Sequence, residues 1–208
     1  MTDPPLARTY AGIGSRATPP DMLELIESIA GTLAREGWVL RTGGSPGADQ
    51  AFYRGARAAH GQVELFLPWP SFEANAWADG DSEIRVSSTP SQDAYDLAAR
   101  FHPAWDGMPS AARHLLARDG HQVLGRDLAT PVRFAVCWTA DGSLDGSSAR
   151  SGGTGQALRI AHQHCVRVVN LARAEHAQRA VQWTGRDQVS SRPNAGPSTD
   201  AETTSPSP

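Results

Sequence analysis

The stretch from residue 38 to residue 60 constrains the fold of this chain more than any other part. It begins with a short apolar run at 38–40, breaks into a turn that contains three glycines, and resumes as an alanine-rich segment at 48–59. This is the pattern of a strand, a tight loop and the N-terminus of a helix. Glycine lets the loop backbone approach a ligand closely, and the free N–H groups of a helix N-terminus favour an anion. The stretch therefore predicts an anion-binding turn that follows a buried strand.

Similar glycine-rich turns occur at 12–16 and at 152–155, each after an apolar run. The hydrophobic pattern predicts strands at 9–16, 38–40, 63–67, 132–138 and 166–171. It predicts helices at 19–35, 48–59, 93–101, 110–118 and 175–181, and one more that runs from the third turn to residue 161. Strands and helices that alternate at this spacing are typical of a parallel sheet covered by helices. We therefore predict an α/β, Rossmann-like, doubly wound fold, with a mainly parallel sheet of about five or more strands and helices on both faces.

Residues 71–130 have a weaker pattern. A short helix is expected at 71–78, whereas 79–92 is polar and rich in turn-forming residues. We interpret 71–130 as a helical excursion from a single domain, because few large apolar residues are available for a second core. The expected organisation is a lead-in at 1–8, one domain at 9–184 and a disordered tail at 185–208, which has almost nothing apolar to offset its ordering entropy.

The composition of the chain is that of an ordinary globular protein, with 208 residues, 39% hydrophobic and 20% charged. No apolar run approaches the roughly 20 residues that span a bilayer, and no secretory signal is recognisable, so we expect a cytoplasmic protein with no membrane partner. Cys137 and Cys165 both lie in apolar runs. They are expected to be buried free thiols, with a disulfide as the alternative.

The charged residues limit the chemistry. The net charge of −3 gives no overall attraction to nucleic acid. All 19 basic residues are arginine, which excludes a lysine-based phosphate site, although the planar guanidinium group binds phosphate well. No cysteine and histidine cluster has zinc spacing, and His162 and His164 point to different faces of their helix. We therefore predict no metal and no cofactor.

If the strands are parallel, their carboxyl ends meet at one edge of the sheet, and the three turns form one pocket lined by backbone N–H groups. Arg41 would add charge to this pocket, and Asp49 would lie in the first turn of its helix, where a capping role is expected. The alternative is that each glycine merely ends a strand or a helix. The predicted ligand- and phosphate-binding residues are Gly12, Gly14, Ser15, Arg16, Thr42, Gly43, Gly44, Ser45, Gly47, Asp49, Gly152, Gly153, Thr154 and Gly155.

The sequence resembles the SLOG superfamily of Rossmann-like proteins. The resemblance covers roughly residues 9–172, and it depends on Gly-Ile-Gly-Ser-Arg at 12–16, Thr-Gly-Gly-Ser-Pro-Gly-Ala-Asp at 42–49 and Gly-Gly-Thr-Gly at 152–155. Within the superfamily the chain is most similar to the DNA-processing protein A (DprA/Smf) branch, especially its short phage or actinobacterial relatives. The resemblance implies a nucleotide or nucleotide-derived ligand, or single-stranded DNA during recombination, and it implies a homodimer.

One departure from the superfamily bears on catalysis. The phosphoribohydrolases of the superfamily share a Pro-Gly-Gly-x-Gly-Thr-x-x-Glu motif whose acid is catalytic. The similar stretch of this chain has Leu158 and Arg159 where carboxylates would be expected. A glycosidic-bond hydrolase without that carboxylate loses its expected acid–base group. Asp49 and Asp141 are the available substitutes, although a helix cap and a solvated turn explain them equally well. The sequence thus favours a binding protein over an enzyme, and it assigns no catalytic residue.

Three functions follow as hypotheses. The first is a nucleotide-binding module with phosphate in the three-turn pocket. The second is a DprA-like binder of single-stranded DNA, for which Arg16, Arg41, Arg54 and Arg57 would gather near one edge of the sheet. The third, the alternative from the same superfamily, is a phosphoribohydrolase-like enzyme that acts on the N-glycosidic bond of nucleoside 5′-monophosphates.

Overall fold

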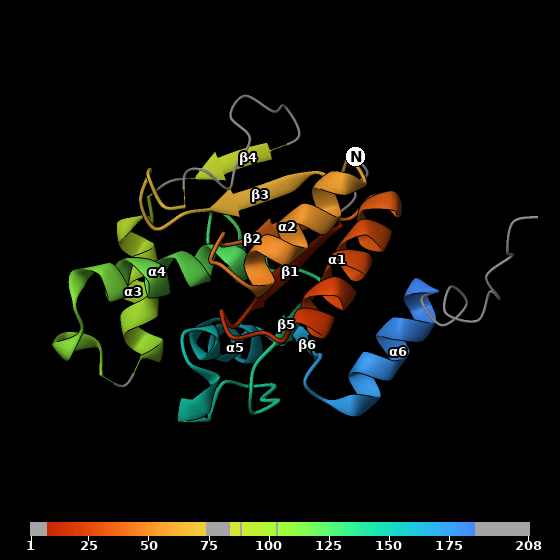
Figure 1. Cartoon of the computed structure of the whole chain (residues 1–208). Helices are drawn as coiled ribbons and strands as arrows, with labels where there is room; N and C mark the ends of the chain where they lie inside the picture. The colour runs from red at the N-terminus through yellow and green to blue at the C-terminus, as the bar shows by residue number, and fades with distance from the viewer. Residues whose placement is uncertain (1–7, 74–83, 88, 103, 186–208) are drawn as a thin grey trace, which may run out of the picture.

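The computed structural model describes residues 8–73, 84–87, 89–102 and 104–185. Its centre is a sheet of six parallel strands in the order β4-β3-β2-β1-β5-β6 (Figure 1). The strands are β1 (Thr9–Gly14), β2 (Val39–Thr42), β3 (Val63–Phe66), β4 (Ile84–Ser87), β5 (Phe134–Trp138) and β6 (Arg167–Asn170). The predicted α/β, Rossmann-like class with a parallel sheet is confirmed.

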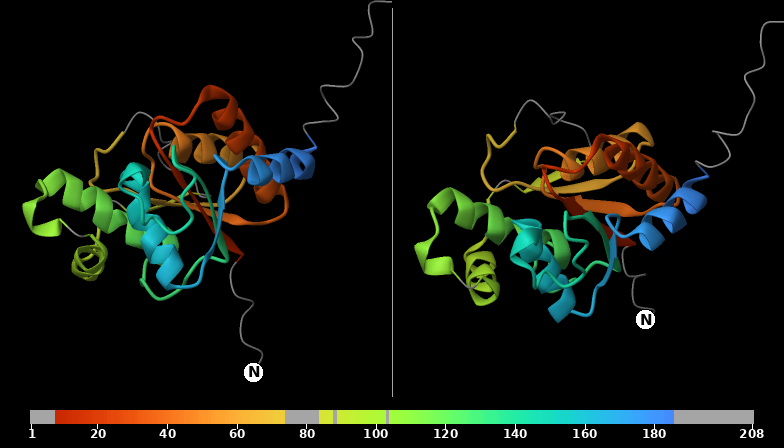
Figure 2. Two further views of the ribbon diagram at one scale, coloured as in Figure 1. Left: turned by 90° about the horizontal axis from the view of Figure 1, so that it is seen from below. Right: turned by 60° about the horizontal axis from the view of Figure 1, so that its bottom comes forward.

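Helices cover both faces of the sheet (Figure 2). One face carries α1 (Pro20–Arg35), α2 (Ala48–Ala58) and α6 (Ala174–Thr184); the other carries α3 (Gln92–Phe101), α4 (Ser110–Leu124) and α5 (Thr154–Gln163). The chain order explains the two layers. Strands β2, β3 and β4 extend the sheet on one side of β1, whereas β5 and β6 extend it on the other side. The strand order reverses at β1, and ligands of such sheets bind at the carboxyl ends of the strands on either side of that point.

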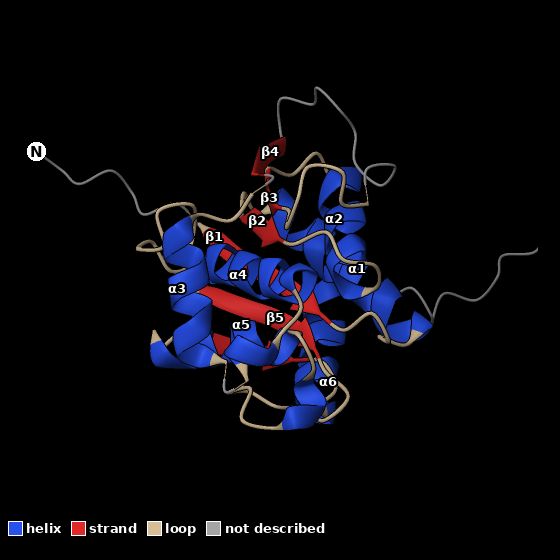
Figure 3. Cartoon of the chain, turned by 90° about the vertical axis from the view of Figure 1, so that its left-hand side faces the viewer, coloured by secondary structure: helices blue, strands red, loops and turns tan. Residues whose placement is uncertain are grey.

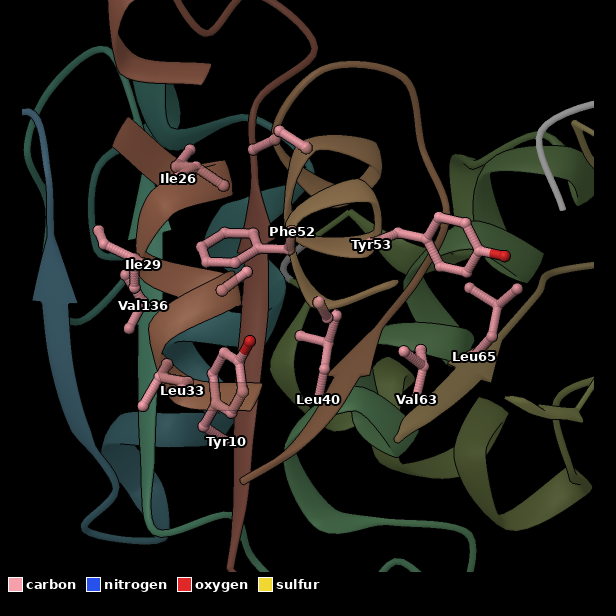
Figure 4. Packing of buried hydrophobic residues seen from close by; sticks show 14 of the residues in the cluster. Tyr10, Ile26, Ile29, Leu33, Leu40, Phe52, Tyr53, Val63, Leu65 and Val136 are labelled. Carbon is pink, nitrogen blue, oxygen red and sulfur yellow. The ribbon is translucent and has the colours of Figure 1, made fainter. Parts of the chain in front are cut away.

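The strand β1 is buried on both of its faces, because its side chains alternate between two cores. Tyr10 packs with the residues of α1 and α2, whereas Ala11 and Ile13 pack with those of α4 and α5. Figure 4 shows the first core, in which Phe52 of α2 lies close to the sheet. A Cβ atom at Gly12 would be 2.5 Å from the Phe52 ring, so this glycine serves the packing of α2 onto β1.

The predicted helical excursion at 71–130 is wrong in two respects. The polar stretch 79–92 contains β4, an edge strand with Val86 47% exposed. Its sequence lacks a hydrophobic pattern because an edge strand buries few of its side chains. The helix predicted at 110–118 continues to Leu124 and covers the sheet itself by packing against β1, β2 and β3. Residues 110–124 are therefore part of the second helical layer of the domain.

The remaining differences are smaller. Four of the five predicted strands are shorter than predicted, whereas β2 is one residue longer than the predicted 38–40, and α6 is longer than predicted. Cys137 is buried and free as expected, but Cys165 is free and exposed. Most of the helix expected at 71–78, almost all of the lead-in and all but the first residue of the tail lie outside the described residues. Within the described ranges, no helix is both long and apolar enough to cross a membrane.

Helices α1 and α2 pack closely at Gly55, and this contact gives a test of the fold. A Cβ atom at Gly55 would overlap the backbone carbonyl of Glu27. We expect Gly55→Ala to lower the free energy of unfolding by about 1–3 kcal/mol, because the overlap outweighs the better helix propensity of alanine. Gly107→Ala is the control, since no atom lies within 4 Å of its added Cβ. Urea unfolding measures both, and a Gly55→Ala protein as stable as the parent would contradict the packing described here.

Candidate functional site

The three glycine-rich turns meet at one cavity of about 350 Å³. It lies at the carboxyl ends of β1, β2 and β5, next to the point where the strand order reverses. Figure 3 shows the molecule from the side to which the β3 and β4 arrows point in Figure 1. Helices α4 and α5 pack beside each other on this side. The residues that line the cavity are Gly14, Ser15, Arg16, Ser45, Asp49, Leu115, Leu116, Arg118, Asp119, Gln122, Ala140, Arg150, Ser151, Gly152, Gly153, Thr154 and Ala157.

The structure brings eight of the fourteen predicted binding residues to the wall of this cavity. They are Gly14, Ser15, Arg16, Ser45, Asp49, Gly152, Gly153 and Thr154. The other six do not line it; these are Gly12, Thr42, Gly43, Gly44, Gly47 and Gly155. Most of this second group serves the packing behind the wall. The Thr42 hydroxyl donates to the Gly12 carbonyl at 2.7 Å, and a Cβ at Gly47 would be 2.6 Å from the Ser15 carbonyl oxygen.

The turn before α2 is closed by a carboxylate of the protein itself. Asp49 Oδ1 accepts the Gly14 N–H at 3.1 Å, and its Oδ2 accepts the Ser45 N–H at 3.2 Å. The Ala48 N–H, at the start of α2, donates to the Ser15 carbonyl. Asp49 therefore does more than cap its own helix, because it joins the loops after β1 and β2. Among the amide groups that the sequence offered to an external anion at this turn, that of Ser45 is taken by Asp49.

The turn before α5 is open. Within the described part of the chain, the N–H groups of Gly153 and Thr154 donate to no protein acceptor. Gly152 has φ +59°, which favours glycine, but Gly153 has an ordinary helical backbone at φ −60°. A Cβ atom at Gly153 would meet nothing within 4 Å. Neither packing nor backbone geometry requires glycine at 153, and its small size leaves the helix N-terminus accessible.

Three arginines line the cavity, Arg16, Arg118 and Arg150, but the predicted cluster of four is wrong. Arg16 and Arg150 are exposed at the cavity wall and form no ion pair with any described residue. Arg41 is buried away from the cavity, where it donates to Glu64 at 2.6 Å and to the Thr130 carbonyl at 2.7 Å.

The other two members of the predicted cluster also have structural partners. Arg54 pairs with Glu27 at 2.6 Å on the surface of the α1–α2 layer. Arg57 donates to the Gly61 carbonyl at the end of α2. Of the four arginines in the predicted cluster, only Arg16 therefore lines the cavity.

Helix α4 supplies a wall of the cavity that the sequence prediction missed. Its residues there are Leu115, Leu116, Arg118, Asp119 and Gln122. The last three are polar side chains that the structure buries in the second half of the helix. The sequence did indicate that this helix is unusual, because the segment has no clear separation between a polar face and an apolar face. Its polar residues interrupt the side that packs on the sheet.

Arg118 connects this wall to the loops. Its Nη1 donates to Asp49 Oδ2 at 3.5 Å, its Nη2 donates to Ser45 Oγ at 3.2 Å, and its Nε is 3.2 Å from Asp119 Oδ1. One buried guanidinium group therefore lies between two buried carboxyl groups. A Cβ atom on Gly43 would overlap this guanidinium, so that glycine makes room for Arg118.

Burial raises the pKa of both carboxyl groups in the cavity wall, Asp49 and Asp119. Burial raises the pKa of Asp119 to about 7, Arg118 opposes the rise, the negative charge of Asp49 adds to it, and Arg159 opposes it weakly. The Gln122 amide donates to Asp119 Oδ1 at 3.0 Å and accepts the Gly43 N–H at 2.7 Å. Among the described residues, those of the cavity included, no group of His, Cys, Asp and Glu is arranged to hold a metal ion.

Comparison with known proteins gives similarity in structure only. No family model matches the chain, and no curated protein matches it in sequence. A molybdenum cofactor carrier protein from Chlamydomonas reinhardtii is similar with 16% identity, 86% of each chain covered and a TM-score of 0.47. DNA processing protein A from Streptococcus pneumoniae is similar with 13% identity, 86% of this chain and 61% of that chain covered, and a TM-score of 0.40.

A third similar structure is DNA processing protein A from Helicobacter pylori, with 11% identity, 88% of this chain and 80% of that chain covered, and a TM-score of 0.36. These likenesses concern the course of the backbone alone.

The raised pKa of Asp119 predicts how stability depends on pH. The folded protein keeps this proton up to about pH 7, whereas the unfolded chain loses it near pH 4, so the contribution of Asp119 to stability falls as the pH rises between these values. Asp119→Asn removes this loss. We expect the free energy of unfolding of the variant, relative to that of the parent protein, to rise by about 2–3 kcal/mol between pH 5 and pH 8. Urea unfolding of both proteins at both pH values measures this change. The exposed Asp96→Asn should show no such gain, and a parallel pH dependence of parent and Asp119→Asn would contradict the assignment.

Proposed function

We propose that this protein binds a nucleotide or a nucleotide-derived ligand and holds its phosphoryl group at the N-terminus of α5. The observation that carries the proposal is the pair of N–H groups at Gly153 and Thr154, which donate to no described residue and border the cavity. Free N–H groups and the positive end of a helix dipole stabilise an anion together. The turn before α2 differs from the turn before α5, because it already holds the carboxyl group of Asp49 on the Ser45 N–H.

The charge around the α5 turn favours phosphate over a weaker anion. Arg16 and Arg150 border the same cavity without a carboxylate partner among the described residues. A guanidinium group donates two parallel hydrogen bonds to phosphate oxygens. The Thr154 side chain also lines the cavity, and its hydroxyl can donate to a third oxygen.

The rest of the cavity suits the non-phosphate part of a nucleotide. Its volume of about 350 Å³ lies at the lower end of the range of roughly 300–1,000 Å³ that small-molecule sites occupy. The α4 wall offers the apolar side chains of Leu115 and Leu116 beside the polar side chains of Asp119 and Gln122. A mononucleotide, with an apolar base face and polar edges and hydroxyls, matches such a wall.

Single-stranded DNA, with a role in recombination, is the second candidate ligand. A strand binder needs a basic groove that follows several phosphates, whereas Arg41, Arg54 and Arg57 are engaged elsewhere in the fold. The α5 turn offers one phosphate position. We therefore place a mononucleotide first and keep a DNA role, together with the homodimer that the resemblance implies, as predictions.

Calorimetry tests the proposal. AMP, CMP, GMP and UMP are titrated into the protein, with the corresponding nucleosides as ligands that lack phosphate. We expect at least one nucleotide to bind and its nucleoside to bind much more weakly. Arg150→Gln should weaken the binding about tenfold, because a charge-assisted hydrogen bond contributes about 1.5–3 kcal/mol. The absence of binding by all four nucleotides would overturn the proposal.

The matched control is Arg167→Gln, which removes the same charge at the exposed start of β6, at the opposite edge of the sheet from the cavity. It should leave the affinity unchanged. A gel-shift assay with a single-stranded oligonucleotide decides the second candidate. Retardation that falls steeply with salt and is lost in Arg150→Gln would place DNA first.

A further inference from the structure

A second cavity lies between α1, α6 and the strands β5 and β6, and we call it the α6 groove. Its volume is about 660 Å³, within the range of roughly 300–1,000 Å³ that small-molecule sites occupy. Phe134 and Arg167, the first residues of β5 and β6, line it together with Trp38, which directly precedes β2. The α6 groove therefore lies at the amino ends of these strands, and it shares no lining residue with the cavity of the three turns.

The α6 groove is open because α6 covers little of the sheet. Helix α6 lies beside α1 (Figure 1), but Ala180 is its only buried residue, and the short side chain of alanine does not fill the space above the strands. On the side of α1 and β5 the α6 groove is lined by the apolar residues Ile29, Leu33 and Val136, which are labelled in Figure 4.

Three aromatic side chains line the α6 groove without being fully covered. Trp38 and Phe134 are partly buried, and their ring centroids are 4.9 Å apart with the rings 71° from parallel. Trp183 of α6 is 45% exposed. Apolar surface that stays open and has polar groups at its rim is typical of a binding groove.

The polar groups of the α6 groove favour an anion. The formal charges of Glu36 and Arg167 cancel, which leaves the charge of Arg179. Arg179 forms no ion pair with any described residue. It lies three residues after His176, on the same face of α6.

The imidazole ring of His176 offers a second donor. Its Nδ1 is 3.0 Å from the Asn170 backbone nitrogen and 3.2 Å from the Asn170 carbonyl oxygen. The shorter contact assigns Nδ1 as the acceptor of the Asn170 N–H, so the proton of the neutral ring is on Nε2. The α6 wall thus presents a guanidinium group and an N–H group beside an aromatic surface.

We propose that the α6 groove binds a small aromatic anion, a flat apolar molecule that has one carboxylate or sulfonate group. The rings of Trp38, Phe134 and Trp183 pack against its aromatic body. Arg179 and the His176 Nε2–H donate charge-assisted hydrogen bonds to its acid group. This site is separate from the phosphoryl site at α5, so the failure of either proposal leaves the other standing.

Fluorescence titration with 8-anilinonaphthalene-1-sulfonate tests the proposal, because this dye is an aromatic anion whose emission rises in an apolar site. N-phenyl-1-naphthylamine has the same rings without the sulfonate and is the uncharged comparison. We expect one anionic dye to bind per chain. Arg179→Gln should weaken its binding about tenfold and leave the binding of the uncharged dye unchanged. The matched control is Arg100→Gln, at an exposed position of α3 on the opposite face of the sheet, and it should change neither.

Two further variants test the place of binding. Ala180→Trp puts an indole ring into the α6 groove and should weaken the binding of both dyes about tenfold. Trp183→Ala removes an exposed ring and should weaken it several-fold. Urea unfolding shows whether each variant is folded, and Trp183→Ala keeps the test decisive if Ala180→Trp is not.

Three results would overturn the proposal. The first is the absence of binding of the anionic dye, or binding that Arg179→Gln and Trp183→Ala leave unchanged. The second is binding that Arg150→Gln weakens in place of Arg179→Gln, which would put the dye in the cavity of the three turns. The third is a dimer in light scattering that Trp183→Ala dissociates, without dye binding to the parent protein, which would show that a second copy occupies the α6 groove.

Discussion

The buried contact between Asp49 and Arg118 organises this site. Asp49 holds the loops after β1 and β2 through the N–H groups of Gly14 and Ser45, and Arg118 attaches α4 to the same point at 3.5 Å. A buried ion pair contributes little net stability, because both charges lose their hydration, but removal of one partner leaves the other uncompensated at a cost of about 3–5 kcal/mol. The contact thus fixes where four segments of the chain meet, more than it stabilises the fold.

This arrangement gives the two ends of the cavity different properties. At α2 the turn already holds a carboxyl group of the protein, that of Asp49, on the Ser45 N–H. At α5 the N–H groups of Gly153 and Thr154 have no acceptor within the described chain, and Arg16 and Arg150 stand beside them without carboxylate partners. Asp49 and Asp119 both lie against the single guanidinium of Arg118, so the α4 wall has no free positive charge and an added phosphate is attracted to the α5 end.

The sequence predicted the features that depend on local pattern. Apolar runs that end in glycine turns located five of the six strands and the convergence of three loops, because both follow from periodicity and from the geometry of parallel sheets. It missed β4, whose half-exposed side chains have no hydrophobic period, and it missed the α4 wall. In the sequence alone, Arg118, Asp119 and Gln122 have the pattern of a solvent-exposed helix face. Their burial depends on tertiary contacts with Asp49 and Gly43, which the sequence pattern does not indicate. It also could not tell the closed turn from the open one, since that difference depends on the side chain of Asp49.

The central claim is that a phosphoryl group binds at the N-terminus of α5. Amide ¹H–¹⁵N correlation spectra of the labelled protein, recorded during a titration with AMP, test it most directly. The account predicts that the largest shifts fall on the amides of Gly153 and Thr154, while those of Gly14 and Ser45, held by Asp49, move little. Shifts concentrated at Gly43, Gly44 and Gly47, with Gly153 and Thr154 unmoved, would contradict it.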